Sequence, residues 1–272
     1  MNAEAIARAI VRSEAVSFPL FMLGDRGIER RLGLAVARVA GLVCLSSREM
    51  PGALFTRALG YGTLVAPTQR AIDAVVRHYE RLGLPARVEL PSSASRSAIR
   101  LLERSGFRRE EGALRVHVHE PRRPRPLPEV AELRIRPVGR TAGDATAYAK
   151  LATRGFGGKG IVSLVFERGW IRQLTRGRRA NAFVGEIAGR PAATGVLYVV
   201  RPAAGLYSGS VLPAFRGRGI QSAMIAARVR HGMARGLRLF FSMTQHNPPS
   251  ERNLRDAGFR TRFEIHRYVR ET

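Results

Sequence analysis

The residues with the clearest chemical potential form one short segment, 211–221, with the sequence VLPAFRGRGIQ. It leads from an apolar, strand-like stretch through a loop into a helix. At a helix start the first backbone N–H groups have no partner within the helix, and the positive end of the helix dipole lies at the same place. Such a start suits a phosphate or pyrophosphate. Gly217 and Gly219 allow a close approach of the backbone, and Arg216 and Arg218 add positive charge. The segment therefore predicts an anion-binding loop.

The charge of the chain agrees with an anionic ligand and is unevenly placed. The net charge is +25, from 46 basic and 21 acidic residues. Residues 1–120 hold 18 basic and 12 acidic residues, a net charge of +6, whereas residues 121–272 hold 28 and 9, a net charge of +19. A biased genome composition would also produce this excess of arginine. The basic half nevertheless attracts polyanions, which include a nucleotide-bearing cofactor, an acidic substrate and nucleic acid.

Composition excludes several other classes of site. The single cysteine, Cys44, excludes an intrachain disulfide and a cysteine-rich metal site, and its apolar surroundings predict a buried thiol. His117 and His119 alternate along one segment but have no third ligand nearby, so we expect no metal. The start of the chain has no convincing signal peptide, and the apolar run 16–23 is too short to span a membrane. We expect a cytoplasmic protein without a membrane partner.

The elements that position the loop alternate between strand and helix patterns. In the second half, strands are predicted at 133–138, 182–187, 193–200, 206–212 and 237–244, and helices at 141–155, 163–176 and from 220 to Gly236. In the first half, a helix at 70–82 is followed by a strand at 86–90. This order predicts a mixed α/β fold with a sheet in each half.

The two halves echo each other and are separated by a proline-rich break. Each ends with a short helix, a Gly-Phe-Arg triplet (Gly106 and Gly258 are the two glycines) and a strand, at 113–119 and 262–269. Four prolines between residues 121 and 128 predict an extended linker. We therefore predict a first domain over 1–120, a linker over 121–131 and a second domain over 132–272. Residues 63–69, the counterpart of the loop in the first half, lack its paired glycines and arginines.

This arrangement resembles the GNAT superfamily of acyl-CoA-dependent N-acetyltransferases. The family pattern Gln/Arg-x-x-Gly-x-Gly/Ala is met by Arg216 and Gly219, whereas Gln221 stands where the family prefers glycine or alanine. The preceding Val-x-Pro and the later Asn-x-x-Ala and Gly-Phe are matched by Val211, Leu212, Pro213, Asn247, Gly258 and Phe259, with Ser250 in place of the alanine. The match covers 132–272 well and 1–120 only in its last part. The chain looks like a tandem GNAT protein with a degenerate first repeat, in which each domain has a mixed, mostly antiparallel sheet flanked by helices.

The resemblance implies a site for acetyl-CoA or another acyl-CoA. In such enzymes the strand before the loop pairs with the pantetheine arm, which implicates Val211 and Leu212. The backbone N–H groups from Arg216 to Gln221 would hold the pyrophosphate, and Asn247 and Ser250 would contact the cofactor further along. The predicted cofactor-binding residues are Val211, Leu212, Arg216, Gly217, Arg218, Gly219, Ile220, Gln221, Asn247 and Ser250. No metal is implied.

The implied reaction is acyl transfer to the primary amine of a small molecule or protein, by direct attack within a ternary complex. The amine must lose a proton, and the thioester oxygen needs aimed donors. Glu186 is a candidate base, with an ion pair to an arginine as the alternative. Tyr207 or Ser210 is a candidate acid, with strand packing as the alternative. Leu254 stands where many family members have a tyrosine acid.

Two other functions remain open from the sequence. The missing tyrosine and Gln221 also fit a non-catalytic module that binds or senses acyl-CoA. The charge alone fits a nucleic-acid or ribosome-associated protein, although aromatic residues make up only 7% of the chain and are not interleaved with its basic segments. We expect a monomer or a homodimer.

Overall fold

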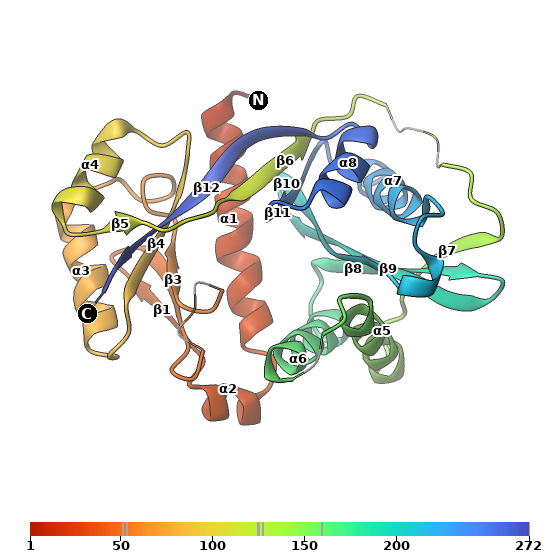
Figure 1. Ribbon diagram of the computed structural model, residues 1–272, viewed down its shortest axis with the longest axis horizontal. Helices are drawn as coiled ribbons and strands as arrows, with labels where there is room; N and C mark the ends of the chain where they lie inside the picture. The colour runs from red at the N-terminus through yellow and green to blue at the C-terminus, as the bar shows by residue number, and fades with distance from the viewer. Residues whose placement is uncertain (51, 53, 124–125, 127, 159, 272) are drawn as a thin grey trace. The chain divides into compact units, whose positions relative to one another are not determined.

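The computed structural model describes residues 1–50, 52, 54–123, 126, 128–158 and 160–271 and divides the chain into two compact units (Figure 1). The first unit contains residues 1–116 together with 261–272, and the second contains residues 117–260. The C-terminal strand therefore clusters with the N-terminal half of the chain. Strand β6 (Leu114–His119) passes from the first unit into the second.

The first unit has a mixed sheet in the order β1-β2-β3-β4-β12, in which β5 also pairs with β12. Its pairs are antiparallel except for β3 and β4, which are parallel. Side chains of α3, β4 and α4, among them Val75, Tyr79, Val88 and Leu102, form its buried core. The elements are α1 (Ala3–Met22), α2 (Arg26–Leu32), β1 (Ala35–Val39), β2 (Leu42–Ser46), β3 (Arg57–Leu59), α3 (Gln69–Glu80), β4 (Ala86–Pro91), α4 (Arg96–Arg104), β5 (Arg108–Arg109) and β12 (Arg260–Arg270).

The second unit has a sheet in the order β11-β10-β9-β8-β7, in which only β10 and β11 are parallel. Helices α5 and α6 cover one face of this sheet, and α7 and α8 lie on the other (Figure 1). The elements are β7 (Leu133–Pro137), α5 (Ala142–Gly155), α6 (Ile161–Thr175), β8 (Ala180–Ile187), β9 (Arg190–Val200), β10 (Ala203–Val211), the 3-10 turn η1 (Pro213–Phe215), α7 (Ile220–Met233), β11 (Leu239–Thr244) and α8 (Pro248–Asp256).

The predicted echo between the halves is present in the topology of the two units. Each unit places a helix between two parallel strands, β3-α3-β4 in the first and β10-α7-β11 in the second. Each then adds a short helix, α4 or α8, that is followed by a glycine with positive φ, +80° at Gly106 and +95° at Gly258. The mixed α/β fold and the predicted strands and helices are confirmed, with ends that differ by a few residues.

The compact units differ from the predicted domains at two places, since residues 117–131 cluster with the second unit and residues 261–272 with the first. The strand that we expected at 262–269 exists, but it pairs with β4 of the first unit, from Ile265 opposite Pro91 to Arg270 opposite Ala86. A local sequence pattern predicts a strand but not its partner, which here lies far away in the sequence. The residues of the predicted linker that the structure describes adopt no helix or strand, and residues 124, 125 and 127 lie outside the description. No helix among the described residues is long and apolar enough to span a membrane.

Candidate functional site

The predicted anion-binding loop connects β10 to α7 and depends on its glycines. Gly217 has a φ of +79° and Gly219 a φ of +73°, a left-handed conformation that favours glycine. A methyl group at Gly217 would meet no atom within 4 Å, and one at Gly219 would lie 3.6 Å from Val130 Cγ2. Backbone conformation, rather than lack of space, therefore explains both glycines.

The start of α7 presents backbone donors without partners. Gly219 is the N-cap residue and supplies no side-chain cap. The first helix N–H with a partner is that of Ala223, which donates to the Gly219 carbonyl at 3.2 Å. The N–H of Arg216 donates to the Pro213 carbonyl at 3.2 Å, so this residue does not offer the donor that we expected. Within the described part of the chain, the available donors therefore run from Gly217 to Ser222.

The corresponding helix start in the first unit is capped by a side chain. Thr68 caps α3, and its hydroxyl accepts the N–H of Ala71 at 3.2 Å. One of the helix-start donors thus has a partner from its own chain. This contrast agrees with a first repeat in which the helix start stabilises the helix and binds no anion.

The arginines of the loop make contacts within the protein. Arg216 donates through Nε to the Val211 carbonyl at 3.1 Å and through Nη2 to the Gly155 carbonyl at 3.3 Å. These bonds tie the loop to the end of β10 and to α5. The Arg218 guanidinium lies 5.8 Å from the centre of the Phe215 ring, and that of Arg190 lies 5.9 Å from it. The side chain of Arg216 thus holds the loop in shape, while Arg218 contributes charge beside it.

Two cavities adjoin the loop. A cavity of about 320 Å³ lies between the start of α7, at Gly219 and Ser222, and the end of α8, at Asp256 and Ala257. A second, of about 500 Å³, lies between α5 and strands β8 and β9 and reaches Leu212 and Phe215 of the loop. The second cavity is lined by one carboxylate, Asp144, and by four cations, Arg136, Lys150, Arg154 and Arg190. The surroundings of the loop are therefore electropositive.

Strands β10 and β11 pair only at their beginnings. Their parallel register ends where Gly205 lies opposite Phe241, although β10 continues to Val211 and β11 to Thr244. One side-chain bond links them beyond this point, from Ser242 Oγ to the Leu206 carbonyl at 3.2 Å. The backbone ladder between β10 and β11 thus ends at Gly205, before the loop.

A bulge interrupts β10 within this stretch. Its register with β9 shifts between Tyr207 and Ser210, and Ser208 has a φ of +51°, which a non-glycine residue seldom adopts. Such strain is typical of functional positions. Ser208 and Gly209 are half-buried.

The three candidate acids and bases lie on this sheet, and each of them has contacts within the protein. Arg136 Nε donates to Glu186 Oε1 at 2.8 Å. This is the ion pair that we expected if Glu186 were not a catalytic base. Ser210 is buried, and its hydroxyl lies 2.8 Å from that of Thr194. Tyr207 is half-buried on the stretch of β10 that β11 leaves, and its ring packs against those of Tyr198 and Phe241.

The predicted contacts on α8 have local structural roles. Asn247 is the N-cap of the helix, and its Oδ1 accepts the N–H of Ser250 at 3.1 Å. Leu254, at the position of the family's tyrosine, is 4% exposed and packs in the core of the second unit. This position therefore offers no proton donor.

Two polar side chains lie on the sheet-facing side of α7: Gln221, which was predicted as a cofactor-binding residue, and Arg228, which was not predicted. Arg228 is 1% exposed, and its guanidinium donates to the carbonyls of Met224, Val196 and Tyr207 at 2.9, 3.4 and 3.3 Å. Gln221 lies two turns earlier, and its buried Oε1 has no hydrogen-bond partner. Burial lowers the pKa of Arg228 to about 10, so the group is protonated at neutral pH.

A sequence signal for Arg228 exists in the glycines opposite it. A methyl group at Gly195 would lie 2.8 Å from Arg228 Cζ. One at Gly209 would lie 2.8 Å from Gln221 Nε2 and 3.3 Å from Arg228 Nη2. Two strand glycines beside a helix that carries an arginine on its apolar face indicate a buried polar contact.

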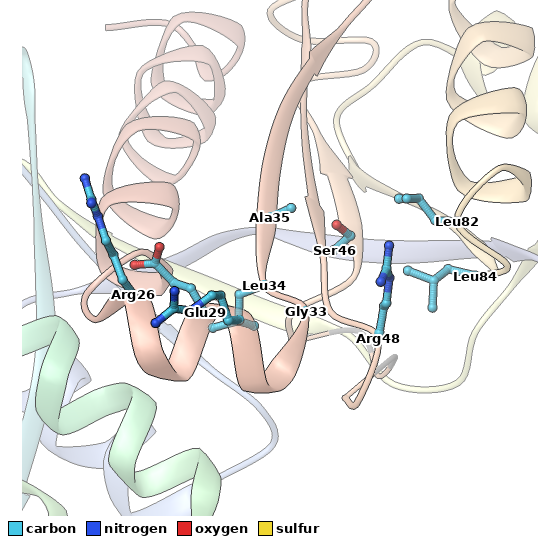
Figure 2. Close-up of a pocket in the computed structure, with 10 residues that line it drawn as sticks. Arg26, Glu29, Gly33, Leu34, Ala35, Ser46, Arg48, Leu82 and Leu84 are labelled. Atoms are coloured by element: carbon cyan, nitrogen blue, oxygen red, sulfur yellow. The ribbon is translucent and has the colours of Figure 1, made fainter.

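The first unit has a hollow of its own, of about 460 Å³ (Figure 2). Arg26 and Glu29 of α2 lie on one side of it and Leu82 and Leu84 on the other (Figure 2). None of its lining residues belongs to 63–69, the counterpart of the anion-binding loop. No group of three or more potential ligands that could hold a metal ion occurs among the residues that the structure describes.

Comparison with known proteins agrees with this geometry. Residues 153–259 match the family described as Acetyltransferase (GNAT) family. A solved structure described as a GCN5-related N-acetyltransferase from Kribbella flavida is 15% identical, with a TM-score of 0.64 over 94% of this chain and 96% of that one. Another, a tandem GNAT protein from the clavulanic acid biosynthesis pathway, is 14% identical, with a TM-score of 0.65 over 100% of this chain and 97% of that one. No curated protein matches the sequence significantly.

Residues 153–259 of the second unit thus match the acetyltransferase (GNAT) family, and the fold of the whole chain is similar to that of a tandem GNAT protein. The family supports acyl transfer as the general class of activity.

Proposed function

We propose that this protein is an N-acyltransferase that transfers an acetyl or other acyl group from acyl-CoA to a primary amine. The observation that carries the proposal is the uncapped start of α7, where backbone donors from Gly217 to Ser222 lie beside the stretch of β10 beyond its ladder with β11. A pyrophosphate fits the donors, and an extended pantetheine arm fits the strand edge. The ligand is therefore an acyl-CoA bound to the second unit.

The residues proposed to bind the cofactor are those of the loop and the preceding strand. Gly217, Gly219, Ile220 and Gln221 would offer backbone donors to the pyrophosphate, and Arg218 would add charge. Val211 and Leu212 would border the pantetheine arm, although the Leu212 N–H already donates to the Ala192 carbonyl at 2.8 Å. Arg216 would act by holding the loop, and Asn247 and Ser250 by holding the start of α8. Acyl-CoA would supply the activated thioester.

The amine would attack the thioester directly, so no nucleophilic side chain is required. Among the three candidate residues, we assign the role of acid to Tyr207, because its ring lies on the stretch of β10 that β11 leaves. Glu186 lies in an ion pair with Arg136, and the buried hydroxyl of Ser210 lies against that of Thr194, which favours supporting roles for both. A water chain would then carry away the proton of the amine.

The decisive experiment measures acetyl-CoA binding by calorimetry and thermal shift. The wild type should bind and gain stability with increasing ligand, and Gly219→Glu should abolish binding by repelling the phosphates. Gly236→Glu is the matched control, because Gly236 also has a positive φ, of +79°, with no atom within 4 Å of an added methyl, at the other end of α7. Equal affinity of a folded Gly219→Glu variant would refute the assignment of the loop.

A non-catalytic acyl-CoA-binding module is a second candidate. The burial of Leu254 at the position of the family's tyrosine favours it. Release of the CoA thiol from acetyl-CoA in the presence of a panel of amines separates the two functions. Binding together with amine-dependent release supports the enzyme, whereas binding without release by any amine supports the module.

A further inference from the structure

The buried guanidinium of Arg228 is an unusual feature of the second unit. It is fully enclosed between α7 and strands β9 and β10, and within the described part of the chain it pairs with no carboxylate. Removing a cation from water is unfavourable unless nearby groups replace the lost hydration. Here the replacement consists only of backbone carbonyls. A hydrophobic side chain of similar size would fill the space without this cost, so stability does not explain the arginine.

The position of Arg228 links it to the bulge of β10. Its Nη1 donates to the carbonyls of Val196 and Tyr207, which lie opposite each other at the last regular pair before the bulge. Gly195 and Gly209 leave room for the guanidinium, since an added methyl on either would lie within 3.4 Å of it. The strained residue, Ser208, follows the carbonyl of Tyr207 directly.

The peptide between Tyr207 and Ser208 connects the buried cation to a donor on the other side of the strand. The carbonyl and the N–H of one peptide point in opposite directions. The Ser208 N–H therefore points away from Arg228. A cation on the Tyr207 carbonyl polarises this peptide and strengthens its N–H as a donor. Ser208 is half-buried while Arg228 is enclosed, so a buried charge lies behind a residue that is partly exposed.

We propose that Arg228 is a positioning residue for acyl transfer, which fixes the bulge of β10 and polarises the Tyr207–Ser208 peptide so that the Ser208 N–H is presented to the thioester oxygen. This inference rests on the proposed function. Gln221 belongs to the same arrangement, because its side chain also lies beside Gly209, from two turns earlier in α7. Gln221, which stands where the family prefers glycine or alanine, thus lies beside the same strand glycine as the buried Arg228.

The test is the infrared spectrum of bound acetyl-CoA labelled with ¹³C at the thioester carbonyl. In the wild type the carbonyl stretch should lie below its value in solution, because a strong donor weakens the C=O bond. Arg228→Met should bind acetyl-CoA with unchanged affinity and return the stretch toward the solution value. Arg228→Lys, which keeps a charge but not the forked geometry, should give an intermediate value. Arg230→Met is the matched control, an exposed arginine of the same helix, and should leave the stretch unchanged.

Turnover provides a second readout. With any amine that the wild type accepts, or with water as the acceptor, Arg228→Met should lower kcat by about 10- to 100-fold and leave the KM for acetyl-CoA unchanged. Its Tm should equal or exceed that of the wild type. If this variant does not fold, Gly195→Ala replaces it, because its methyl group displaces the guanidinium and should give the same spectral change.

The outcomes distinguish a failure of the proposed role of Arg228 from a failure of the proposed acyltransferase function. A wild type that fails to bind acetyl-CoA overturns the proposed function and this inference with it. A wild type that binds, with the same carbonyl stretch in Arg228→Met or in folded Gly195→Ala, overturns the inference alone. A loss of affinity in Arg228→Met equal to its loss in kcat/KM assigns the residue to ligand binding and also overturns it.

Discussion

The ion pair between Arg136 and Glu186 argues against Glu186 as the catalytic base. The pair is 2.8 Å long, with 15% of the Glu186 side chain and 45% of the Arg136 side chain exposed. A carboxylate held by an arginine on the neighbouring strand is poorly placed to accept a proton from an amine. The same geometry stabilises the pairing of β7 with β8, since Arg136 lies on β7.

We therefore predict that Glu186→Gln keeps the rate of acyl transfer within about threefold of the wild type and lowers stability by less than ~1 kcal/mol. Steady-state kinetics between pH 6 and 9 and urea unfolding measure the two effects. Glu111→Gln, an exposed glutamate outside this sheet, is the control for loss of one negative charge. A hundredfold fall in kcat together with the loss of the acidic limb of the pH profile would instead make Glu186 the base.

At the scale of elements, the two helices between parallel strands differ in how they begin. Helix α3 begins with a threonine whose hydroxyl caps it, whereas α7 begins with a glycine that leaves its donors open. A capped start contributes stability, and an open start can receive an anion. The same element of the fold thus has a capped start in one unit and an open start in the other, and only the open start is proposed to bind an anion.

This contrast predicts the effect of removing the cap. Thr68→Ala should destabilise the first unit by about 1 kcal/mol, because the N–H of Ala71 loses its side-chain acceptor and keeps only the Thr68 carbonyl at 3.1 Å. Urea unfolding monitored by circular dichroism measures it, with Arg70→Ala, an exposed residue in the first turn of the same helix, as the control. Affinity for acetyl-CoA should not change. A weakened affinity in Thr68→Ala would show that the start of α3 contributes to the cofactor site.

At the scale of the whole molecule, the chain closes its first unit with its last residues. Strand β12 pairs with β4 over six positions, and Arg267 Nε lies 3.4 Å from the buried carboxylate of Glu89. Truncation after Arg260 should therefore leave an edge of β4 unpaired and Glu89 without this partner. We expect the first unit to lose its cooperative unfolding transition.

Limited proteolysis and calorimetry test the truncation, with removal of Glu271 and Thr272 alone as the control, since β12 ends at Arg270. A truncated chain that retains the full unfolding enthalpy would show that β12 is dispensable. The first unit would then fold from residues 1–116 alone.

Three histidines predict how stability depends on pH. Burial, with a smaller contribution from a neighbouring arginine, lowers the pKa values of His78, His231 and His266 below the ordinary 6.5. A lowered histidine pKa means that the unfolded chain binds protons more readily than the folded one. Stability should therefore be complete above pH 6.5 and should fall as the pH drops below it.

Thermal unfolding between pH 7.5 and 5.5 measures this dependence. His231→Gln should make it shallower, because Arg235 Nη1 lies 3.2 Å from His231 Nδ1 and this contact opposes protonation of the ring. His246→Gln is the control, since its side chain is 73% exposed. A Tm that rises on acidification would contradict the prediction.

The sequence by itself determined the features that depend on local patterns of residues. Alternating apolar residues predicted the strands, three-to-four spacing predicted the helices, and the two glycines and two arginines at 216–219 predicted the open start of α7. These features depend on neighbouring residues alone, because backbone conformation and helix ends are set within a turn or two.

Only the tertiary structure decided which distant residues meet. It placed β12 beside β4, paired Glu186 with Arg136, turned the side chain of Arg216 back onto Val211 and Gly155, and brought Arg228 beneath the bulge of β10. Each of these contacts joins segments that no local pattern relates. Their partners are selected by the packing of helices against sheets and by the need to satisfy buried polar groups, and both are properties of the whole fold.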